Sequence, residues 1–162
     1  MGTRMVPSDY SISKKIEENL YSFYNIIAKT SGKTGYCGSD VNWVITKPSY
    51  WPNQIYGARF NKNNIEKRIR EILETPLIKA TKPRWVIGPT SRPKELSVYL
   101  EKNGFQLQYE CPGTAKAAIK DAKKAGYYIG VLDASKLGES VYRKIGFKEY
   151  CRIKYYQWVK SK

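Results

Sequence analysis

The most regular pattern of hydrophobic and polar positions lies between residues 127 and 156. An apolar run from Tyr127 to Leu132 predicts a buried strand. A helix is predicted next, because apolar residues recur at helical spacing at Leu137, Val141 and Ile145. Ser135 stands where this helix would begin, and Gly146 stands where it would end. Hydrophobic and polar residues alternate from Phe147 onward, so the unit is predicted to be a strand, a helix and a strand.

The preceding part of the chain is predicted to alternate between helices and strands. Apolar residues spaced three or four apart indicate amphipathic helices over residues 16–28, 65–73 and 93–104. Strand-forming runs occupy residues 41–46, 54–60, 85–87 and 105–109. The segment 30–39 is rich in Gly, Ser, Thr and Lys and is predicted to be a loop. Tyr50 and Trp51 lie between two prolines and either pack over the sheet or line a substrate mouth.

A further helix is predicted immediately before residue 127. Small and apolar residues form a narrow stripe at Ala115, Ala118, Ile119 and Ala122. Gly126 is placed to end this helix.

Two stretches of the sequence resemble each other, residues 86–105 and residues 131–147. Each reads as a strand, a serine, a helix containing Ser-Val-Tyr, and a lysine shortly before Gly-Phe. One such unit by itself would bury little hydrophobic surface. Two units side by side are predicted to form a larger sheet covered by helices.

Length and charge set broad limits on the function. A chain of 162 residues fits a single domain, 1–162. The formal net charge is +15, from 29 Lys and Arg residues against 14 Asp and Glu residues. A field of this size attracts anions, and three explanations stay open: a solvated lysine-rich surface, an anionic small ligand, or nucleic acid.

The cysteine and histidine content argues against a metal site. Cys37, Cys111 and Cys151 show no metal-ligand spacing, and histidine is absent. We therefore expect a reduced, intracellular protein without zinc or another metal. The sequence has no apolar run of membrane-spanning length and no signal-peptide core at its start, so we expect a cytoplasmic protein without a membrane partner.

One motif carries a resemblance to a known family. The run S-x6-Y-x-K-x-G-F, formed here by Ser135, Tyr142, Lys144, Gly146 and Phe147, resembles the C-terminal signature of the GNAT superfamily of N-acetyltransferases. The resemblance implies a GNAT-like α/β (α+β) fold, with a mixed, mostly antiparallel sheet of about six to seven strands and helices on both faces. It also implies that Tyr142 is catalytic and protonates the leaving thiolate of acetyl-CoA, and that Ser135 helps to hold the cofactor.

The same family binds the pyrophosphate of CoA at a loop with the signature Q/R-x-x-G-x-G/A. Gln108 and Gly113 match its outer positions, and Cys111 replaces the first glycine. The expected cofactor-binding residues at this loop are Gln108, Tyr109, Cys111, Gly113, Thr114 and Ala115. Free backbone N–H groups at the start of the following helix would bind the phosphates. Pro112 removes one of those donors, and Cys111 adds a side chain where the backbone must approach phosphate.

The chain as a whole is similar to a shortened tandem-repeat acetyltransferase. Residues 1–109 would be the degenerate N-terminal copy, and residues 110–162 would be the last third of the C-terminal copy. The strands that carry the acceptor amine and its general base are absent from the second copy. A truncated sheet would expose an edge that a second subunit could cover, so a homodimer is an open expectation.

Two functional hypotheses follow. The first is an acyl-CoA dependent N-acyltransferase that uses acetyl-CoA on a small-molecule or peptide amine, with Glu110, Asp133 and Glu139 as candidate bases. The second is a catalytically inactive GNAT-like module that binds an anionic partner, nucleic acid among them, through its basic surface. Lysines interleaved with tyrosines in residues 148–160 would suit phosphate contacts and base stacking, although strand alternation explains them equally well.

Overall fold

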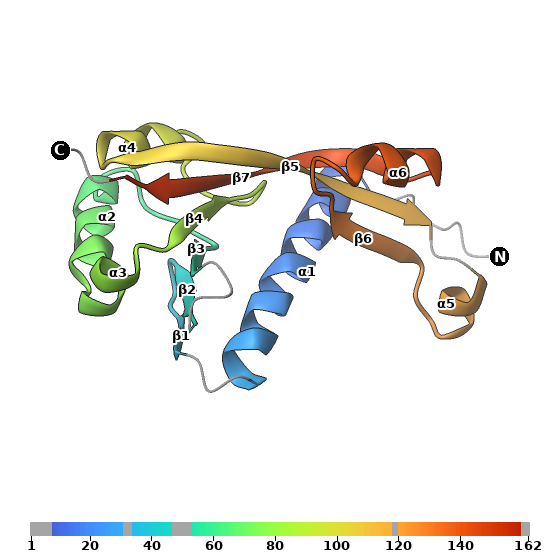
Figure 1. Cartoon of the computed structure of the whole chain (residues 1–162), viewed down its shortest axis with the longest axis horizontal. Coiled ribbons are helices and arrows are strands. Elements are labelled where there is room, and N and C mark those ends of the chain that lie inside the picture. The colour runs from blue at the N-terminus through green and yellow to red at the C-terminus, as the bar shows by residue number, and fades with distance from the viewer. Residues whose placement is uncertain (1–7, 31–33, 47–52, 118–119, 160–162) are drawn as a thin grey trace.

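The computed structural model describes residues 8–30, 34–46, 53–117 and 120–159, and a mixed seven-stranded sheet forms its centre (Figure 1). The order across the sheet is β1-β2-β3-β4-β7-β5-β6. The bounds are Thr34–Cys37 (β1), Asn42–Ile45 (β2), Gln54–Tyr56 (β3), Arg84–Ile87 (β4), Phe105–Ala117 (β5), Ile129–Asp133 (β6) and Lys148–Trp158 (β7). All neighbouring strands are antiparallel except β3 and β4. The predicted mixed, mostly antiparallel sheet is therefore confirmed.

The two similar stretches of sequence form interleaved units in this sheet. The first is β4, α4 (Leu96–Lys102) and β5, and the second is β6, α6 (Glu139–Lys144) and β7. Strand β7 lies between β4 and β5, and β5 lies between β7 and β6. Each unit therefore encloses one strand of the other, so the units are interleaved and do not lie side by side as predicted. The boundary expected near residue 109 falls inside β5, which continues through it.

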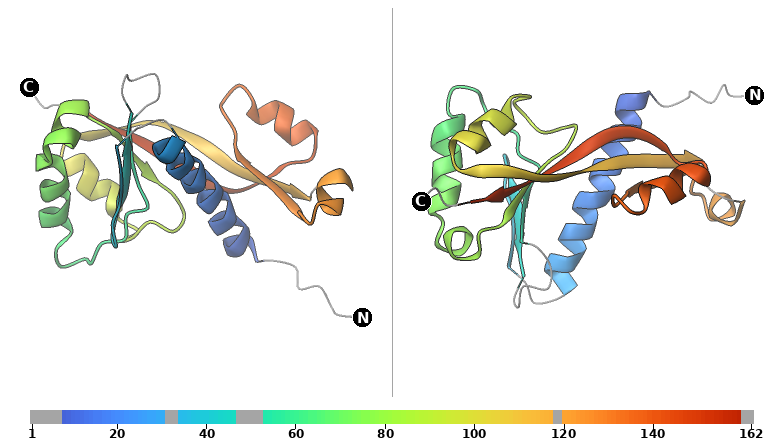
Figure 2. Two further views of the ribbon diagram at one scale, coloured as in Figure 1. Left: turned by 90° about the horizontal axis from the view of Figure 1, so that it is seen from below. Right: turned by 45° about the horizontal axis from the view of Figure 1, so that its top comes forward.

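Helices cover both faces of the sheet, as predicted (Figure 2). Helix α1 (Asp9–Thr30) lies on one face and buries Ile12, Ile16, Leu20 and Tyr24 against it. Helices α2 (Ile65–Glu74), α3 (Pro76–Thr81) and α4 cover the other face of the N-terminal half. Neighbouring strand residues point in opposite directions, so Val86 and Tyr155 face α1, whereas Trp85 and Tyr156 face α2 to α4.

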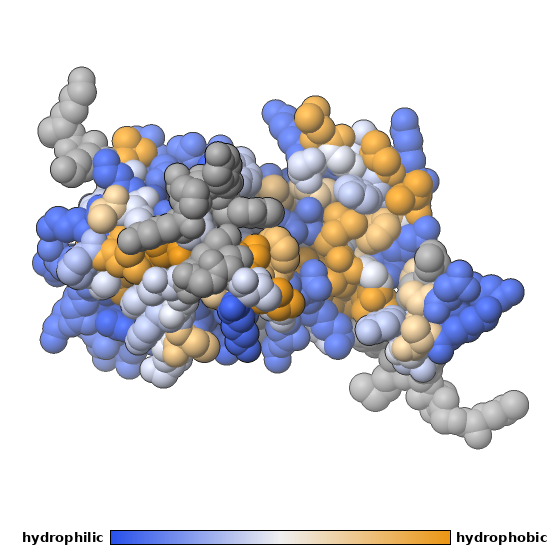
Figure 3. Space-filling view, turned by 60° about the horizontal axis from the view of Figure 1, so that its bottom comes forward, coloured by the Kyte–Doolittle hydropathy of each residue, from blue (hydrophilic) through white to orange (hydrophobic). Residues whose placement is uncertain are grey.

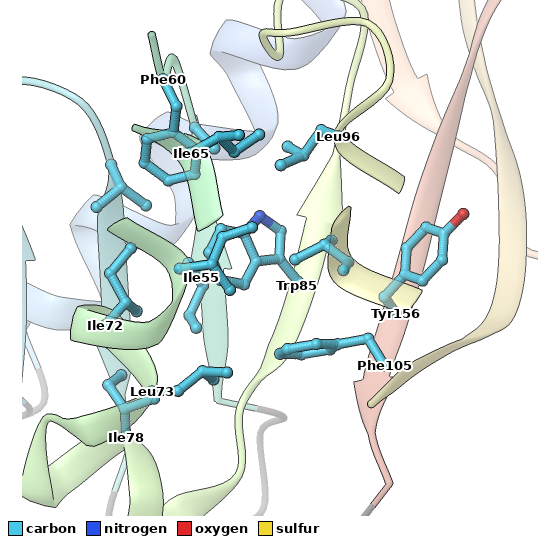
Figure 4. Close-up of a cluster of buried hydrophobic side chains, with 14 of the residues drawn as sticks. Ile55, Phe60, Ile65, Ile72, Leu73, Ile78, Trp85, Leu96, Phe105 and Tyr156 are labelled. Atoms are coloured by element: carbon cyan, nitrogen blue, oxygen red, sulfur yellow. The ribbon is translucent and has the colours of Figure 1, made fainter. Parts of the chain in front are cut away.

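Trp85 lies at the centre of the larger hydrophobic core (Figure 4). Its ring meets Phe105 edge-on at a centroid distance of 5.7 Å and Phe60 at 6.1 Å. Helix α2 contributes the stripe predicted from its apolar spacing, which consists of Ile65, Ile69, Ile72 and Leu73. This half of the molecule therefore holds together around a well-packed core.

The segment 30–39 contains a strand that its composition does not predict. Strand β1 pairs with β2, and Tyr36 stacks on Trp43 at a centroid distance of 3.9 Å. Pairing with β2 and this aromatic contact outweigh the low strand propensity of Gly and Ser. The predictions for Tyr50 and Trp51 concern residues outside the described part of the chain.

The helix predicted from Ala115 is wrong over most of its length. Strand β5 continues through Ala115 to Ala117, and helix α5 comprises only Lys120–Lys124. Residues 113–117 pair with β6 on one side, and residues 113–115 also pair with β7 on the other. This double pairing overrides the helix preference of alanine. Of the predicted stripe, Ala118 and Ile119 lie outside the described residues.

The predictions of burial around β6 and α6 are also wrong. Tyr127 and Tyr128 are 67% and 60% exposed, and β6 is only half-buried. Helix α6 buries none of its residues, and the predicted inward stripe is exposed at Leu137, Val141 and Ile145. The physical reason is that β6 is the last of the described strands in the sheet, so the described part of the sheet offers no further strand on which this stripe could pack.

Candidate functional site

A cleft of ≈ 700 Å³ opens where β6 ends and the outer edge of β5 becomes free. Strand β6 pairs with β5 from Ala117 back to Gly113, and the chain then leaves the sheet after Asp133. The cleft is lined by β5, by β7 and by the segment that enters α6: Gln108, Tyr109, Glu110, Cys111, Asp133, Ser135, Lys136, Glu139, Arg152 and Tyr155.

Two stacked tyrosines and a carboxylate form the floor of this cleft. The rings of Tyr109 and Tyr155 stack at a centroid distance of 4.6 Å. The Tyr155 hydroxyl donates a hydrogen bond to Asp133 Oδ2 at 3.2 Å, and Arg84 Nη1 donates to the Tyr109 hydroxyl at 3.0 Å. Burial raises the pKa of Tyr155 above its usual range, and nearby Tyr24 and Asp133 raise it further. Tyr155 therefore stays protonated and holds the Asp133 carboxylate in place.

Three charged residues that line the cleft form ion pairs with neighbouring residues. Glu110 pairs with Lys154 at 3.4 Å, and Arg152 Nε bonds to Glu149 at 2.6 Å. Glu139 pairs with Arg143 at 2.9 Å. Glu110, Asp133 and Glu139, which the sequence offers as bases, all line the same cleft. Two of these three carboxylates are held by cations, and the third accepts the Tyr155 hydrogen bond.

Cys111 is not an activated thiol. Burial, and secondarily the nearby Asp133 carboxylate, raise its pKa from 9.0 to about 11. A thiol with a raised pKa is protonated at neutral pH and is a weak nucleophile. The site therefore offers no thiolate for covalent catalysis.

Four of the seven predicted cofactor residues come together in this cleft. Gln108, Tyr109 and Cys111 line it from β5, and Ser135 lines it from the opposite side. The Ser135 hydroxyl accepts a hydrogen bond from the Gly138 N–H at 3.1 Å and so closes the turn before α6. Sequence reasoning missed Tyr155, Arg152 and Lys136. The first two lie on a predicted strand, but only the pairing of β7 with β5 shows that they face this cleft.

The remaining predicted cofactor residues do not form a phosphate-binding loop. Gly113, Thr114 and Ala115 lie in the C-terminal part of β5, between β6 and β7. Their backbone N–H groups lie within the two ladders, because peptide groups along a paired strand alternate between its two neighbours, and the ladder to β7 shifts register between Gly113 and Thr114. Pro112 fits this strand because it lies just past the last residue that pairs with β6. The expected pyrophosphate cradle for acetyl-CoA is therefore absent from these residues, and they do not fit the cofactor.

Tyr142 lies on α6 and does not line the cleft. Its ring meets Phe147 edge-on at a centroid distance of 5.7 Å, and it packs closely over Gly138. Tyr142 and Phe147, two residues of the motif that resembles the family signature, thus contact each other.

The tyrosines proposed for base stacking in β7 are mostly unsuited to it. Tyr155 and Tyr156 are buried on opposite faces of the sheet, and Tyr150 is half-buried. Exposed aromatic rings occur instead at Tyr127 and Tyr128, directly after the lysines of α5.

In comparisons with known proteins, no family model, no curated protein and no solved structure matches this chain. Among the residues that the structure describes, no helix has the length and apolar character needed to cross a membrane. Within the same described ranges, His, Cys, Asp and Glu side chains form no group of three or more that could hold a metal ion.

Proposed function

We propose that this chain is a catalytically inactive, GNAT-like module that binds a polyanion, and that single-stranded nucleic acid is the class of partner. The surface proposed for binding is the α5 turn, defined as residues 120–128. It carries Lys120, Lys123 and Lys124 followed by Tyr127 and Tyr128.

The observation that carries this proposal is the exposure of the two tyrosines beside the lysines. Tyr127 is 67% exposed and Tyr128 is 60% exposed, although each carries a large aromatic ring. The Tyr127 N–H donates to the Ala122 carbonyl at 2.9 Å, which ties the first tyrosine to the end of α5. Single-stranded nucleic acid uses both groups, because lysines contact its phosphates and aromatic rings stack on its bases.

The charge of the chain supports a polyanionic partner in general. With a net charge of +15, it attracts polyanions over long range. In the α5 turn, Asp121 is the single acidic residue, and its carboxylate lies 3.7 Å from Lys124. Two lysines of the turn, Lys120 and Lys123, are exposed and remain available for phosphate contacts.

A second candidate function is the acyl-CoA dependent N-acyltransferase. The observation in its favour is that Gln108, Tyr109, Cys111 and Ser135 line one cleft together with three carboxylates. A cleft with carboxylates and tyrosines could receive an amine. Against it stand the paired backbone of Gly113 to Ala115 and the place of Tyr142 outside the cleft. We therefore rank this candidate second.

Fluorescence anisotropy with a labelled single-stranded RNA tests the first candidate. We expect binding that weakens steeply between about 50 and 200 mM salt, because phosphate contacts release counterions. The double substitution Tyr127→Ala and Tyr128→Ala should weaken binding about tenfold or more, since stacking contributes roughly 1–3 kcal/mol per base. Tyr10→Ala is the matched control, because Tyr10 is 56% exposed on α1 and lies outside the α5 turn.

Two results would oppose the proposal. RNA binding that is absent at low salt would remove nucleic acid as the partner. Thermal stabilisation of the protein by acetyl-CoA would instead favour the transferase, because a ligand at about a hundred times its dissociation constant adds roughly 2.7 kcal/mol of stability.

A further inference from the structure

In the part of the chain that the structure describes, β6 is the last strand on its side of the sheet, and the backbone groups along its outer edge pair with no described strand. The Ala134 N–H donates to the Pro112 carbonyl at 3.0 Å. This bond shows which residues of β6 direct their backbone groups toward β5. Peptide groups alternate along a strand, so Leu132 and Gly130 bond to β5. The N–H and C=O groups of Ile129, Val131 and Asp133 consequently point away from the sheet.

Most of this edge lacks the features that usually prevent strand pairing. Natural edge strands are protected by lysines, prolines, bulges or a covering segment. Residues 125–132 contain neither a charged residue nor a proline, and Asp133, the last residue of β6, carries the single charge on the strand. In the register between β5 and β6 the pairing is continuous, without a bulge, from Gly113 and Asp133 to Ala117 and Ile129. The edge of β6 is therefore well suited to accept another strand.

Exposed hydrophobic side chains lie beside this edge on helices. On α1, Phe23 is 42% exposed and Ile26 is 59% exposed, and both line a hollow of ≈ 420 Å³ together with Asp133. On α6, an exposed apolar stripe follows the strand in the sequence and consists of Leu137, Val141 and Ile145. Figure 3 shows hydrophobic residues gathered right of the centre, in the part of the molecule that contains α1, β6 and α6.

We propose that a second copy of this chain occupies the β6 edge, with the two β6 strands paired antiparallel about a two-fold axis. Identical antiparallel strands are self-complementary, so the contact closes as a symmetric dimer. The outward groups of Ile129, Val131 and Asp133 are also centred on Val131, so antiparallel pairing about that residue places Ile129 of each strand opposite Asp133 of the other. The two seven-stranded sheets become one continuous sheet.

The net charge gives this dimer a distinctive salt dependence. Two chains that each carry +15 repel one another, and salt screens that repulsion. The contact itself is uncharged along residues 125–132. Dimerisation should therefore strengthen as salt is added, whereas binding of nucleic acid should weaken. The dimer does not depend on the proposed nucleic-acid function, and the two can be tested separately.

Sedimentation velocity of the full chain at about 50 and about 500 mM salt tests the inference. We expect a monomer–dimer equilibrium that shifts toward dimer at the higher salt concentration. Val131→Pro removes an outward N–H without touching the ladder to β5, and it should raise the dimer dissociation constant about tenfold or more. Val131→Ala is the matched control, because it retains that N–H.

A second pair of variants keeps the test decisive if Val131→Pro unfolds the protein. Ile26→Lys adds a charge beside β6 at an exposed position of α1, and it should weaken the dimer. Val98→Lys adds the same charge at a 49% exposed position of α4 and should leave the dimer intact. A chain that stays monomeric at high salt, or a dimer that survives both Ile26→Lys and Val131→Pro, would overturn the inference.

Discussion

Gly113 of β5 and Cys151 of β7 lie opposite each other in the sheet, and the Cys151 thiol fills the space that a side chain at Gly113 would need. A Cβ atom built at Gly113 would overlap Cys151 Sγ and would lie 3.0 Å from Cγ2 of Ile16 in α1. This glycine therefore permits close packing of β5 against β7 and α1. The resemblance to acetyltransferases assigns Gly113 to phosphate binding, whereas in this structure close packing explains why a glycine occupies the position.

We predict that Gly113→Ala destabilises the protein by about 1–3 kcal/mol, because overpacking forces neighbouring groups to move. Equilibrium urea unfolding measures this change. Gly130→Ala is the matched control in β6, since its Cβ would lie 4.0 Å from the closest groups and should change stability little. Combining Gly113→Ala with Cys151→Ala should recover part of the loss. Strictly additive effects would show that the two residues do not compete for space.

Glu17 anchors α1 to the turn after β4. Its carboxylate is buried and accepts hydrogen bonds from the Tyr21 hydroxyl at 2.6 Å and from the Thr90 N–H at 3.0 Å. Glu17→Ala leaves that buried N–H without its acceptor, so we expect a loss of about 1–3 kcal/mol of unfolding free energy. Glu18→Ala, at an exposed position of the same helix, should change stability by less than about 0.5 kcal/mol. Equal effects of the two substitutions in urea unfolding would contradict this role of Glu17.

The thiols of Cys111 and Cys151, one buried and one half-buried, predict a loss of stability at alkaline pH. Burial is the main cause that raises the pKa of both Cys111 and Cys151 from 9.0 to about 11. A group with a higher pKa in the folded state stabilises that state while it is protonated. This contribution is therefore full below about pH 9 and is lost as the pH rises through about 11.

Urea unfolding at about pH 8, 9 and 10 measures this dependence, which should show a decreasing free energy of unfolding. A variant with both cysteines replaced by alanine is less stable at neutral pH but should lose less with each step in pH. The same slope in both proteins would assign the pH dependence to other groups.

Tyr142 tests whether the resemblance to acetyltransferases extends to chemistry. Its ring packs on Phe147, so Tyr142→Phe should change the free energy of unfolding by less than about 0.5 kcal/mol. Tyr142→Ala removes the ring contact and should cost about 1 kcal/mol or more. Acetyl-CoA should shift the unfolding temperature of neither variant nor of the natural chain. An acetyl-CoA shift that Tyr142→Phe abolishes would restore the catalytic assignment.

Local patterns predicted most of the elements in the N-terminal part of the chain. The stripe of α1 and that of α2 are periodic over several turns, and Trp85 lies in a short run of strand-forming residues. Such a pattern reflects which residues of a single helix or strand are buried, and this information lies in a short stretch of the sequence. The cleft was predictable in part, because the sequence assigned Gln108, Tyr109, Cys111 and Ser135 to one site and these residues line the cleft together.

The remaining features depend on pairing between distant segments. Ala115 has a helix-favouring neighbourhood, but β6 and β7 hold it in a strand from both sides. Leu137 has the spacing of a buried position and is 92% exposed, because β6 is the last of the strands that the structure describes in the sheet. The sequence contains no local signal for the place at which a sheet ends.

Amide hydrogen exchange at Gly113, Thr114 and Ala115 tests the central claim most directly, with acetyl-CoA absent and present. Paired between β6 and β7, these three amides should exchange as slowly as the best-protected amides of the sheet, and acetyl-CoA should not change their rates. Rapid exchange in the free protein that slows when acetyl-CoA is added would show an open phosphate-binding loop and would contradict the account.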